Sequence, residues 1–301
     1  TSVGGMINNV KAYASVLMPG VVHMRHTHLE EHKFVSGQPE TGMELANDLE
    51  RICTNFGAEN IAACIVEPIS GSTGTLGTAI VDALSKDNGL FLIGRDETKL
   101  KEQASAINAD YQVIDLNNTV EPREFSKIID SETEIKGLVN CIGSILIKPL
   151  HGTSIAEFND VITTNLFSSY YLLASFARRM KNGSAIFFSS VAGSKGLSNH
   201  EAIAAAKSGI EGFARSAAAT YAKDNLRVNV IAPSIMDSNM SEKILSSEAA
   251  REVSKNMHPI SKIGDADDIL PVIKWLLSQD AKWVTGQTIH VDGGLSTVKP
   301  R

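Results

Sequence analysis

Three glycines in the stretch "GSTGTLG" could bind a nucleotide phosphate, namely Gly71, Gly74 and Gly77. They stand between a short apolar run, "IAACIV" at 61–66, and a helix-like segment at 75–86. Because glycine has no side chain, the backbone can turn tightly and approach a pyrophosphate, and the start of the next helix offers free N–H groups. Glycines also serve ordinary turns, so the spacing favours a dinucleotide site without establishing one.

Arg95 bears on which nucleotide such a site would take. It follows the apolar run "LFLIG" at 90–94. At about 20 residues beyond the glycines, an acidic residue binds the ribose 2′-hydroxyl of NAD, and an arginine accommodates the 2′-phosphate of NADP. Gly94 occupies the expected acidic position, so the sequence favours NADP; a solvated arginine is the alternative. Asp115, at the end of "YQVID", could meet the adenine amine or cap a helix.

Strands and helices alternate from Gly71 onward, and their order predicts the fold. Further apolar runs follow at 136–143, 184–190, 227–232 and 287–292, separated by helix-like segments. This alternation, with runs apolar enough to be buried on both faces, indicates an α/β fold with a doubly wound parallel sheet. Before it, we expect an irregular N-terminal segment with one helix, at 41–56.

These motifs, in this order, resemble the short-chain dehydrogenase/reductase family from Gly71 to about Val298. The matching stretches are "GSTGTLG", "GRD" (94–96), "IDL" (114–116), "NCIG" (140–143), "TTNLFSSYYL" (163–172), "FFSSVAG" (187–193), "AAAKSG" (204–209), "RVNVIAPS" (227–234) and "GQTIHVDGG" (286–294). The resemblance implies a Rossmann-like NAD(P)-binding domain, which we expect at 61–301. It also implies reduction of a small-molecule carbonyl or oxidation of an alcohol, usually in a homodimer or homotetramer.

Within that resemblance, five residues match functional positions of the family. Ser190 matches the catalytic serine, which hydrogen-bonds the substrate oxygen. Lys207 matches the lysine that holds the nicotinamide ribose and lowers the pKa of a catalytic tyrosine. Asn165 matches the asparagine that positions a water in the proton relay. Asn140 and Gly143 match the motif after the fourth strand and are expected to bind the cofactor.

The position of the family's catalytic tyrosine holds a different residue. The tyrosine should stand four residues before Lys207, where "HEAIAAAK" places Ile203. A hydrocarbon cannot transfer a proton, and a positioned acid or base is worth about 10²–10⁴ in rate. His200 could share a helix face with Ile203 and act as a substitute acid, since histidine titrates near neutral pH. The alternative is a histidine that faces solvent near the helix start.

Residues 1–74 resemble a second family. The stretches "TSVGGM", "LMPGVVHMRHTHL", "GQPETGMELANDLERI" and "IAACIVEPISGSTG" are similar to an internal piece of class III, pyridoxal-phosphate-dependent aminotransferases. In that family the aldimine lysine and its aspartate partner come after this piece. The resemblance therefore supplies no catalytic residue, and we expect 1–60 to be a fragment that does not fold independently.

The two resemblances overlap at "GSTG", 71–74, and a chimera joined there is the simplest account. Glu67 and Pro68 would then belong to an aminotransferase strand that replaces the first strand of the reductase. Proline lacks an N–H and is poorly tolerated in a central strand. Glu67 would bring a carboxylate near the pyrophosphate, so both residues should weaken cofactor binding.

Composition limits the partners and the location. The 301 residues carry a net charge of −6 without a basic tract, so we expect neither nucleic acid nor a membrane as partner. Three widely spaced cysteines suit a reducing compartment, and no signal-peptide pattern is visible, so we expect a cytoplasmic protein. We expect no metal site and interpret four clustered histidines as a solvated loop: His23, His26, His28 and His32.

These observations lead to one principal interpretation and two alternatives. The principal one is an NADP-dependent oxidoreductase, with NAD possible, that acts on a carbonyl or alcohol and is impaired by the loss of the tyrosine. The resemblance places its substrate loop near 236–258 and leaves the substrate open. The first alternative is an NAD(P)-binding protein without turnover, which Ile203 favours. The second is an aminotransferase fragment without activity.

Overall fold

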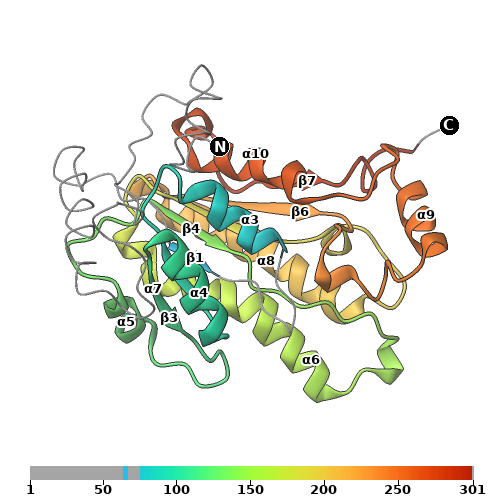
Figure 1. Ribbon diagram of the computed structural model, residues 1–301, viewed down its shortest axis with the longest axis horizontal. Helices are drawn as coiled ribbons and strands as arrows, with labels where there is room; N and C mark the ends of the chain where they lie inside the picture. The colour runs from blue at the N-terminus through green and yellow to red at the C-terminus, as the bar shows by residue number, and fades with distance from the viewer. Residues whose placement is uncertain (1–63, 67–74, 300–301) are drawn as a thin grey trace, which may run out of the picture. The chain divides into compact units, whose positions relative to one another are not determined.

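The computed structural model describes residues 64–66 and 75–299, which belong to the unit Ile61–Arg301. Its seven strands form one parallel sheet in the order β3-β2-β1-β4-β5-β6-β7 (Figure 1). The strands are β1 (Cys64–Val66), β2 (Phe91–Gly94), β3 (Asp110–Val113), β4 (Gly137–Asn140), β5 (Ser184–Phe188), β6 (Arg227–Pro233) and β7 (Thr288–Val291). Each strand falls on or beside an expected apolar run.

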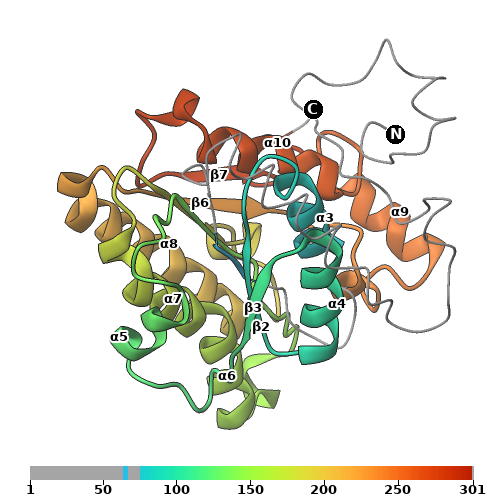
Figure 2. The ribbon, with the colours of Figure 1, turned by 60° about the vertical axis from the view of Figure 1, so that its left-hand side comes forward.

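Helices cover both faces of this sheet, as Figure 2 shows. They are α3 (Thr75–Leu84), α4 (Glu97–Ile107), α5 (Pro122–Phe125), α6 (Ile155–Ile162), α7 (Ser168–Phe176), α8 (Glu201–Tyr221), α9 (Glu248–Asn256) and α10 (Ala266–Leu277). The core between the sheet and helices α5, α7 and α8 includes Leu138 and Phe187. The opposite core, under α3, α4 and α10, includes Val139 and Ile186. Successive strand residues thus enter opposite cores, which confirms the doubly wound α/β fold.

The strand order reverses at β1, whose two neighbours are β2 and β4. Val66, the last residue of β1, pairs with Asn140, the last residue of β4. In open parallel sheets, ligands bind outside the carboxyl ends of the strands at such a switch point. The topology therefore directs attention to the segments that follow β4, β5 and β6.

The start of α6 and the π-helical segment that follows it place residues at that edge of the sheet. Ser154 and Glu157 form a capping box at the start of α6, a kind of cap worth about 1 kcal/mol. The helix then passes through one π-helical segment, Thr163–Phe167, before it continues as α7. A π segment inside a helix redirects its side chains and often marks a functional site, and this one contains Asn165.

Several expectations fall outside the described residues. These are the helix at 41–56, the fragment 1–60, and the residues Gly71, Gly74, Glu67, Pro68, His23, His26, His28 and His32. Their interpretation rests on the sequence alone.

Candidate active site

A cavity of about 180 Å³ opens at the carboxyl ends of β4, β5 and β6. Its walls are mainly apolar and include Leu76, Ile142, Ile145, Ile203, Ile235, Met236 and Met240. Among its few polar groups are Ser190, Lys207, Ser234 and Asp237. An apolar cavity with a few convergent polar groups at the switch edge is the common form of a small-molecule site.

Lys207 reaches this cavity from α8 and is 8% exposed. Its Nζ donates to the carbonyl oxygen of Phe188, at the end of β5, over 2.9 Å. Burial lowers the pKa of Lys207 to about 8, an effect that the nearby Cys141 thiol partly opposes. Among the described residues no second acceptor is hydrogen-bonded to Nζ, so two of its three N–H donors remain for a ligand.

Asn165 lies behind Lys207 and is completely buried. Its Oδ1 accepts the N–H of Ser144 over 3.2 Å, and its Nδ2 donates to the carbonyl of Val161 over 3.0 Å. A Cβ on Gly143 would lie 3.2 Å from this Oδ1 and 3.6 Å from Lys207 Nζ. Glycine at 143 therefore lets the loop after β4 pass close to both side chains and keeps the space beside the ammonium open.

Asn140 has a different setting from the one that the sequence suggested. Its Nδ2 donates to the hydroxyls of Ser168 and Ser169 at the start of α7, and its Oδ1 accepts the N–H of Ile142. It is absent from the residues that line the cavity. Asn140 thus ties the loop after β4 to α7, and its contact with a cofactor stays a prediction.

Ser190 lines the cavity just after β5. Its Oγ accepts the N–H of Ala192 over 3.3 Å, which leaves the hydroxyl hydrogen free to point at a ligand oxygen. Ile203 also lines the cavity and is 3% exposed, so the missing tyrosine is replaced by an apolar wall. His200 occupies the N-cap position of α8 without a capping hydrogen bond from its side chain. Its Nδ1 lies 2.7 Å from the carbonyl oxygen of Ser198, and it does not line the cavity.

The residues expected to hold the rest of a nucleotide lie at the same sheet edge. Gly77 is buried within α3. Arg95 is exposed directly after β2. Asp115 is exposed two residues after β3, and its Oδ1 accepts the N–H of Asn117 over 2.9 Å, which forms a local turn. The structure therefore leaves both charged side chains accessible, with Asp115 already engaged in its turn.

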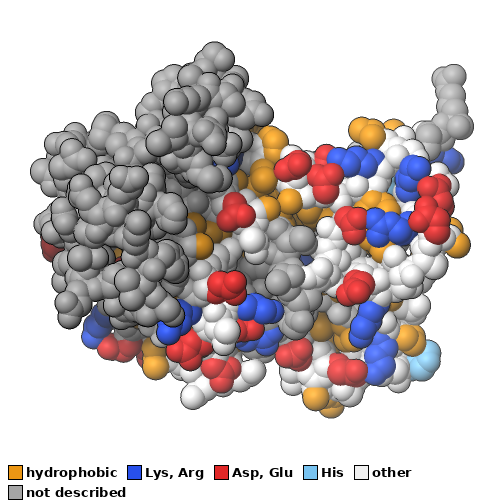
Figure 3. All heavy atoms as spheres, viewed as in Figure 1, with side chains coloured by type: hydrophobic (Ala, Val, Ile, Leu, Met, Phe, Trp, Pro, Cys, Tyr) orange, Lys and Arg blue, Asp and Glu red, His pale blue; other side chains and the backbone are white. Residues whose placement is uncertain are grey.

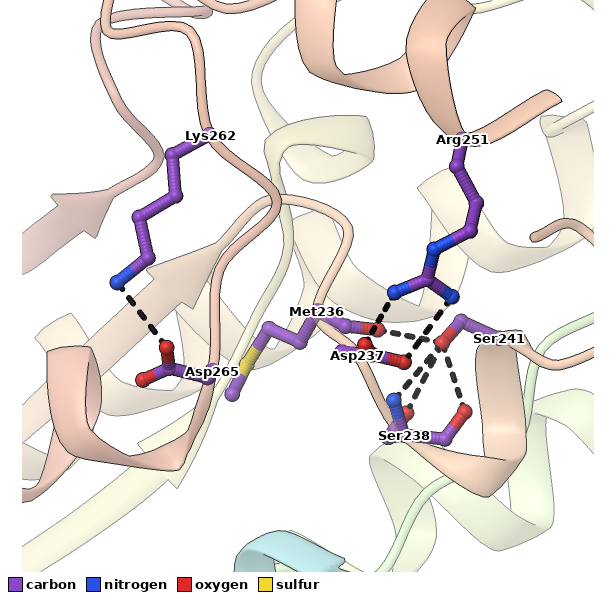
Figure 4. Close-up of polar contacts among 7 residues, drawn as sticks. All are labelled: Met236, Asp237, Ser238, Ser241, Arg251, Lys262 and Asp265. Carbon is purple, nitrogen blue, oxygen red and sulfur yellow. Dashed lines mark hydrogen bonds and ion pairs between the residues drawn. The ribbon is translucent and has the colours of Figure 1, made fainter. Parts of the chain in front are cut away.

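The segment after β6 forms a cavity wall whose internal contacts the sequence did not reveal (Figure 4). The Ser241 hydroxyl donates to the carbonyls of Met236 and Ser238. The Asp237 carboxylate pairs with the guanidinium of Arg251 on α9, and Lys262 pairs with Asp265 over 3.0 Å. The pair of Asp237 and Arg251 ties the wall to α9, in the region expected to bind substrate.

Clusters of metal ligands and membrane-spanning helices are absent from the part of the chain that the structure describes. It contains no cluster of three or more potential metal ligands and no helix with the length and hydropathy of a membrane span. Acidic and basic side chains are interspersed on the face in Figure 3, without a basic patch. Cys141 lines the cavity as a free thiol, and burial raises its pKa to about 12, so it stays protonated.

Comparison with known proteins finds a matching family profile, relatives in sequence and solved structures of similar fold. Residues 73–296 match the family profile described as enoyl-(acyl carrier protein) reductase. A 3-oxoacyl-(acyl-carrier-protein) reductase of Haemophilus influenzae is 33% identical over 235 residues, which cover 75% of this chain and 96% of that protein. A short-chain type dehydrogenase/reductase from Mycobacterium ulcerans has a similar structure, with a TM-score of 0.71, 24% identity and coverage of 79% and 90%. A structure described as ElxO with NADP bound is also similar, with a TM-score of 0.69 and 24% identity. The match covers 78% of this chain and 98% of that one.

The chain therefore belongs to the short-chain dehydrogenase/reductase family, a family of NAD(P)-dependent oxidoreductases. This confirms the resemblance from Gly71 to about Val298. The matched range begins at residue 73 and leaves out residues 1–72, so the aminotransferase-like segment stays a prediction.

Proposed function

We propose that this chain is an NADP-dependent oxidoreductase that interconverts a small-molecule carbonyl and the corresponding alcohol. The observation that carries the proposal is the convergence of Ser190 and Lys207 on one apolar cavity at the switch edge of the sheet. Ser190 would donate its hydroxyl hydrogen to the substrate oxygen, and the free N–H donors of Lys207 would hold the nicotinamide ribose. Bound NADPH would supply the hydride.

The residues around Lys207 suit such a cofactor. Gly143 leaves space beside the ammonium that any Cβ would narrow. Arg95, exposed after β2, would bind the 2′-phosphate, and Asp115 the adenine amine. The Asn165 amide is engaged by Ser144 and Val161, so we assign it mainly to holding the loop after β4 in place. A relay water would need the remaining lone pair of its Oδ1.

The test is a nucleotide titration followed by a substrate screen on the full chain. Calorimetry with NADPH and NADH would measure the affinity for each nucleotide. NADPH absorbance would then follow the reduction of two apolar ketones, cyclohexanone and 2-octanone. We expect tighter binding of NADPH than of NADH and slow but measurable turnover. A chain that binds neither nucleotide would overturn the proposal.

A non-catalytic NAD(P)-binding protein is the second candidate, and Ile203 is the observation that favours it. This candidate predicts NADPH binding without turnover, even after an acid is restored at position 203. The retention of both Ser190 and Lys207 at the cavity favours the enzyme, since a binding role alone does not require a donor to a substrate oxygen.

Three further parts of the proposal rest on the sequence. We propose that 1–60 is an aminotransferase-like fragment without activity, so pyridoxal phosphate should give no absorbance band of a protein-bound aldimine. We propose a homo-oligomer, a dimer or tetramer, to be measured by light scattering. We propose a cytoplasmic location, to be measured by cell fractionation.

A further inference from the structure

A buried histidine stands directly behind one wall of the cavity. His258 follows α9 and is 5% exposed. Its Nδ1 lies 2.7 Å from the carbonyl oxygen of Ser254, and its Nε2 lies 2.7 Å from the Oγ of Ser234. A carbonyl oxygen can only accept, so Nδ1 must carry a hydrogen. In the neutral ring, Nε2 then has a free lone pair and accepts the hydroxyl hydrogen of Ser234.

Ser234 connects this ring to the cavity. It follows the last residue of β6 and lines the same space as Ser190, Lys207 and Ile203. The cavity therefore contains a hydroxyl group that is backed by a titratable ring, while the position of the expected acid is occupied by a hydrocarbon.

The other histidines of the described range 75–299 do not have this connection. His200 contacts the carbonyl of Ser198, and His290 pairs through Nε2 with the Oγ of Ser194 over 2.9 Å. Neither these two histidines, nor His151, nor Ser194 lines the cavity. The pair Ser194–His290 has the same chemistry as Ser234–His258 outside the cavity, which makes it a natural control.

The ring of His258 is fixed from two sides. Ser254 belongs to α9, and Arg251 of the same helix pairs with Asp237 on the cavity wall. On the other side, a Cβ on Gly293, whose φ is +58°, would lie 3.4 Å from the Cβ of His258. This close backbone leaves the imidazole little room to turn away from Ser234.

We propose that Ser234 and His258 form the proton relay of this reductase, with Ser234 in contact with the substrate oxygen. The inference rests on the proposed function. In reduction, a hydride adds to the carbonyl carbon and the C–O π electrons move to oxygen. That oxygen takes the hydroxyl hydrogen of Ser234, and Ser234 Oγ takes the Nε2 hydrogen of the imidazolium of His258. The neutral ring, still protonated at Nδ1, regains its second proton from solvent.

Oxidation of an alcohol runs through the same groups in reverse. The alcohol hydrogen passes to Ser234 Oγ, the serine hydrogen passes to Nε2, and the hydride leaves to the oxidised nucleotide. Ser234 is therefore a catalytic residue in this scheme, and His258 acts through it. The two directions need opposite protonation states of one ring, which provides a specific signature.

The kinetic test compares two substitutions at the relay with two at the control pair. Ser234→Ala removes the hydroxyl, and His258→Gln keeps a hydrogen-bonding group but cannot titrate. Each should lower kcat for 2-octanone reduction by about 100-fold or more, as expected for a lost general acid, while NADPH affinity stays unchanged. Ser194→Ala and His290→Gln should leave kcat within about twofold. Thermal unfolding of each variant checks that the fold is intact.

The pH dependence separates a proton-transfer role from a structural one. In the parent chain, the ratio of the reduction rate to the oxidation rate should depend more steeply on pH than in His258→Gln, because only the parent can pass a proton through the ring. His258→Gln should lose only the part of this pH dependence that comes from the ring. Other ionisable groups are Lys207 and Asp237 on the cavity, Arg251, Glu252 and Lys255 on α9, and Asp292 beside Gly293. The His258→Gln variant retains all of them, so their contributions stay in both profiles.

A spectroscopic readout is independent of turnover. With ¹⁵N-labelled histidine, the His258 signal, assigned by its loss in His258→Gln, should show hydrogen on Nδ1 at high pH. Ser234→Ala should shift its Nε2 resonance, and Ser194→Ala should not. An Nε2–H tautomer, or parent-like kcat in both relay variants, would overturn the relay and leave the proposed function standing. A parent chain without turnover on either ketone would overturn both.

Discussion

Asn165 and Ser144 are hydrogen-bonded to each other and so connect the π-helical segment to the loop after β4, behind Lys207. The N–H of Ser144 donates to Oδ1 of Asn165, and Nδ2 of Asn165 lies 3.1 Å from the Oγ of Ser144. One side chain thereby fixes the π-helical segment against the loop after β4. The carbonyl of Val161 accepts from the same Nδ2, so the amide of Asn165 joins three separate groups.

We therefore expect Asn165→Ala to destabilise the protein through the loss of these internal hydrogen bonds, and not through the loss of a contact with a ligand. The N–H of Ser144 and the carbonyl of Val161 would lose their buried partner, which costs about 1–3 kcal/mol per unsatisfied group. Urea unfolding should show this loss in the free energy of unfolding. Asn118→Ala, at an exposed position, is the control and should change it by under about 0.5 kcal/mol. Equal values for both variants would mean that water replaces the amide.

Arg95→Ala should remove most of the preference for NADPH over NADH. The guanidinium is exposed directly after β2, where it can pair with a 2′-phosphate that NADH lacks. Calorimetry should show several-fold weaker NADPH binding and little change for NADH. Arg123→Ala, another exposed arginine, should leave both affinities as in the parent. Equal binding of the two nucleotides by the parent chain would contradict the role of Arg95.

Ile203→Tyr should increase carbonyl reduction by up to the roughly 10²–10⁴ that a positioned acid supplies. The ammonium of Lys207 would lower the pKa of the new phenol. The gain should fall at the low end of this range if Ser234 and His258 already deliver a proton.

Ile203→Phe is the matched control, because it adds the bulk of a ring without the hydroxyl. Overpacking beside Val161, Ala192 and Ala206 should cost both variants about 1–3 kcal/mol of stability. Steady-state rates with 2-octanone would compare them. If the phenylalanine variant is as fast as the tyrosine variant, the phenol is not the acid.

Lys207→Met should change the stability of the nucleotide-free protein in a pH-dependent way. Burial lowers the pKa of Lys207 from 10.5 to about 8, so between these values the unfolded chain binds the proton and the folded chain does not. The parent should therefore gain stability relative to Lys207→Met as pH rises through this window.

Below pH 8 the buried charge should cost the parent its full penalty, about 3 kcal/mol at 1.36 kcal/mol per pH unit. Urea unfolding of both chains at pH 7 and near pH 10 measures the difference. If the difference in the free energy of unfolding between the two chains stays constant with pH, the ammonium is better solvated than its burial indicates.

Limited proteolysis of the full chain should cut within residues 1–60 before it cuts within 61–301. The expectation rests on the second resemblance, which covers only part of the aminotransferase fold. NADPH should slow cleavage after residue 61 and leave the early cuts unchanged, because binding stabilises only the part that forms the site. Mass spectrometry would locate the cuts. A full-length chain that resists early cleavage would place the junction elsewhere.

The sequence was sufficient to predict the sheet because its central strands are buried on both faces. Gly137–Asn140 and Ser184–Phe188 are buried at every position, so their apolar runs are continuous and distinct. The sequence also singled out Ser190 and Lys207, since each has a fixed place in a motif. The structure then brings both to one cavity.

Other features of the site depend on three-dimensional contacts that no local pattern encodes. The π-helical segment at Thr163–Phe167 has the composition of an ordinary helix, so the sequence did not predict the direction of Asn165. Ser234 and His258 are 24 residues apart with α9 between them, and only the folded chain shows their hydrogen bond. His200 shares the helical spacing of Ile203 but does not line the cavity, because spacing along a helix does not reveal where its first turn points.

The ion pair between Asp237 and Arg251 also has a consequence for how this protein responds to its solution. Both side chains are partly exposed, 55% for Asp237 and 36% for Arg251. Dissolved ions screen such a pair over a Debye length of about 10 Å at 0.1 M salt, and pairs of this kind contribute about 0–1 kcal/mol. The attachment of α9 to the cavity wall is therefore partly set by ionic strength. If this attachment limits the room for a large substrate, the relative rates of large and small ketones should change with salt concentration and should be compared at a single one.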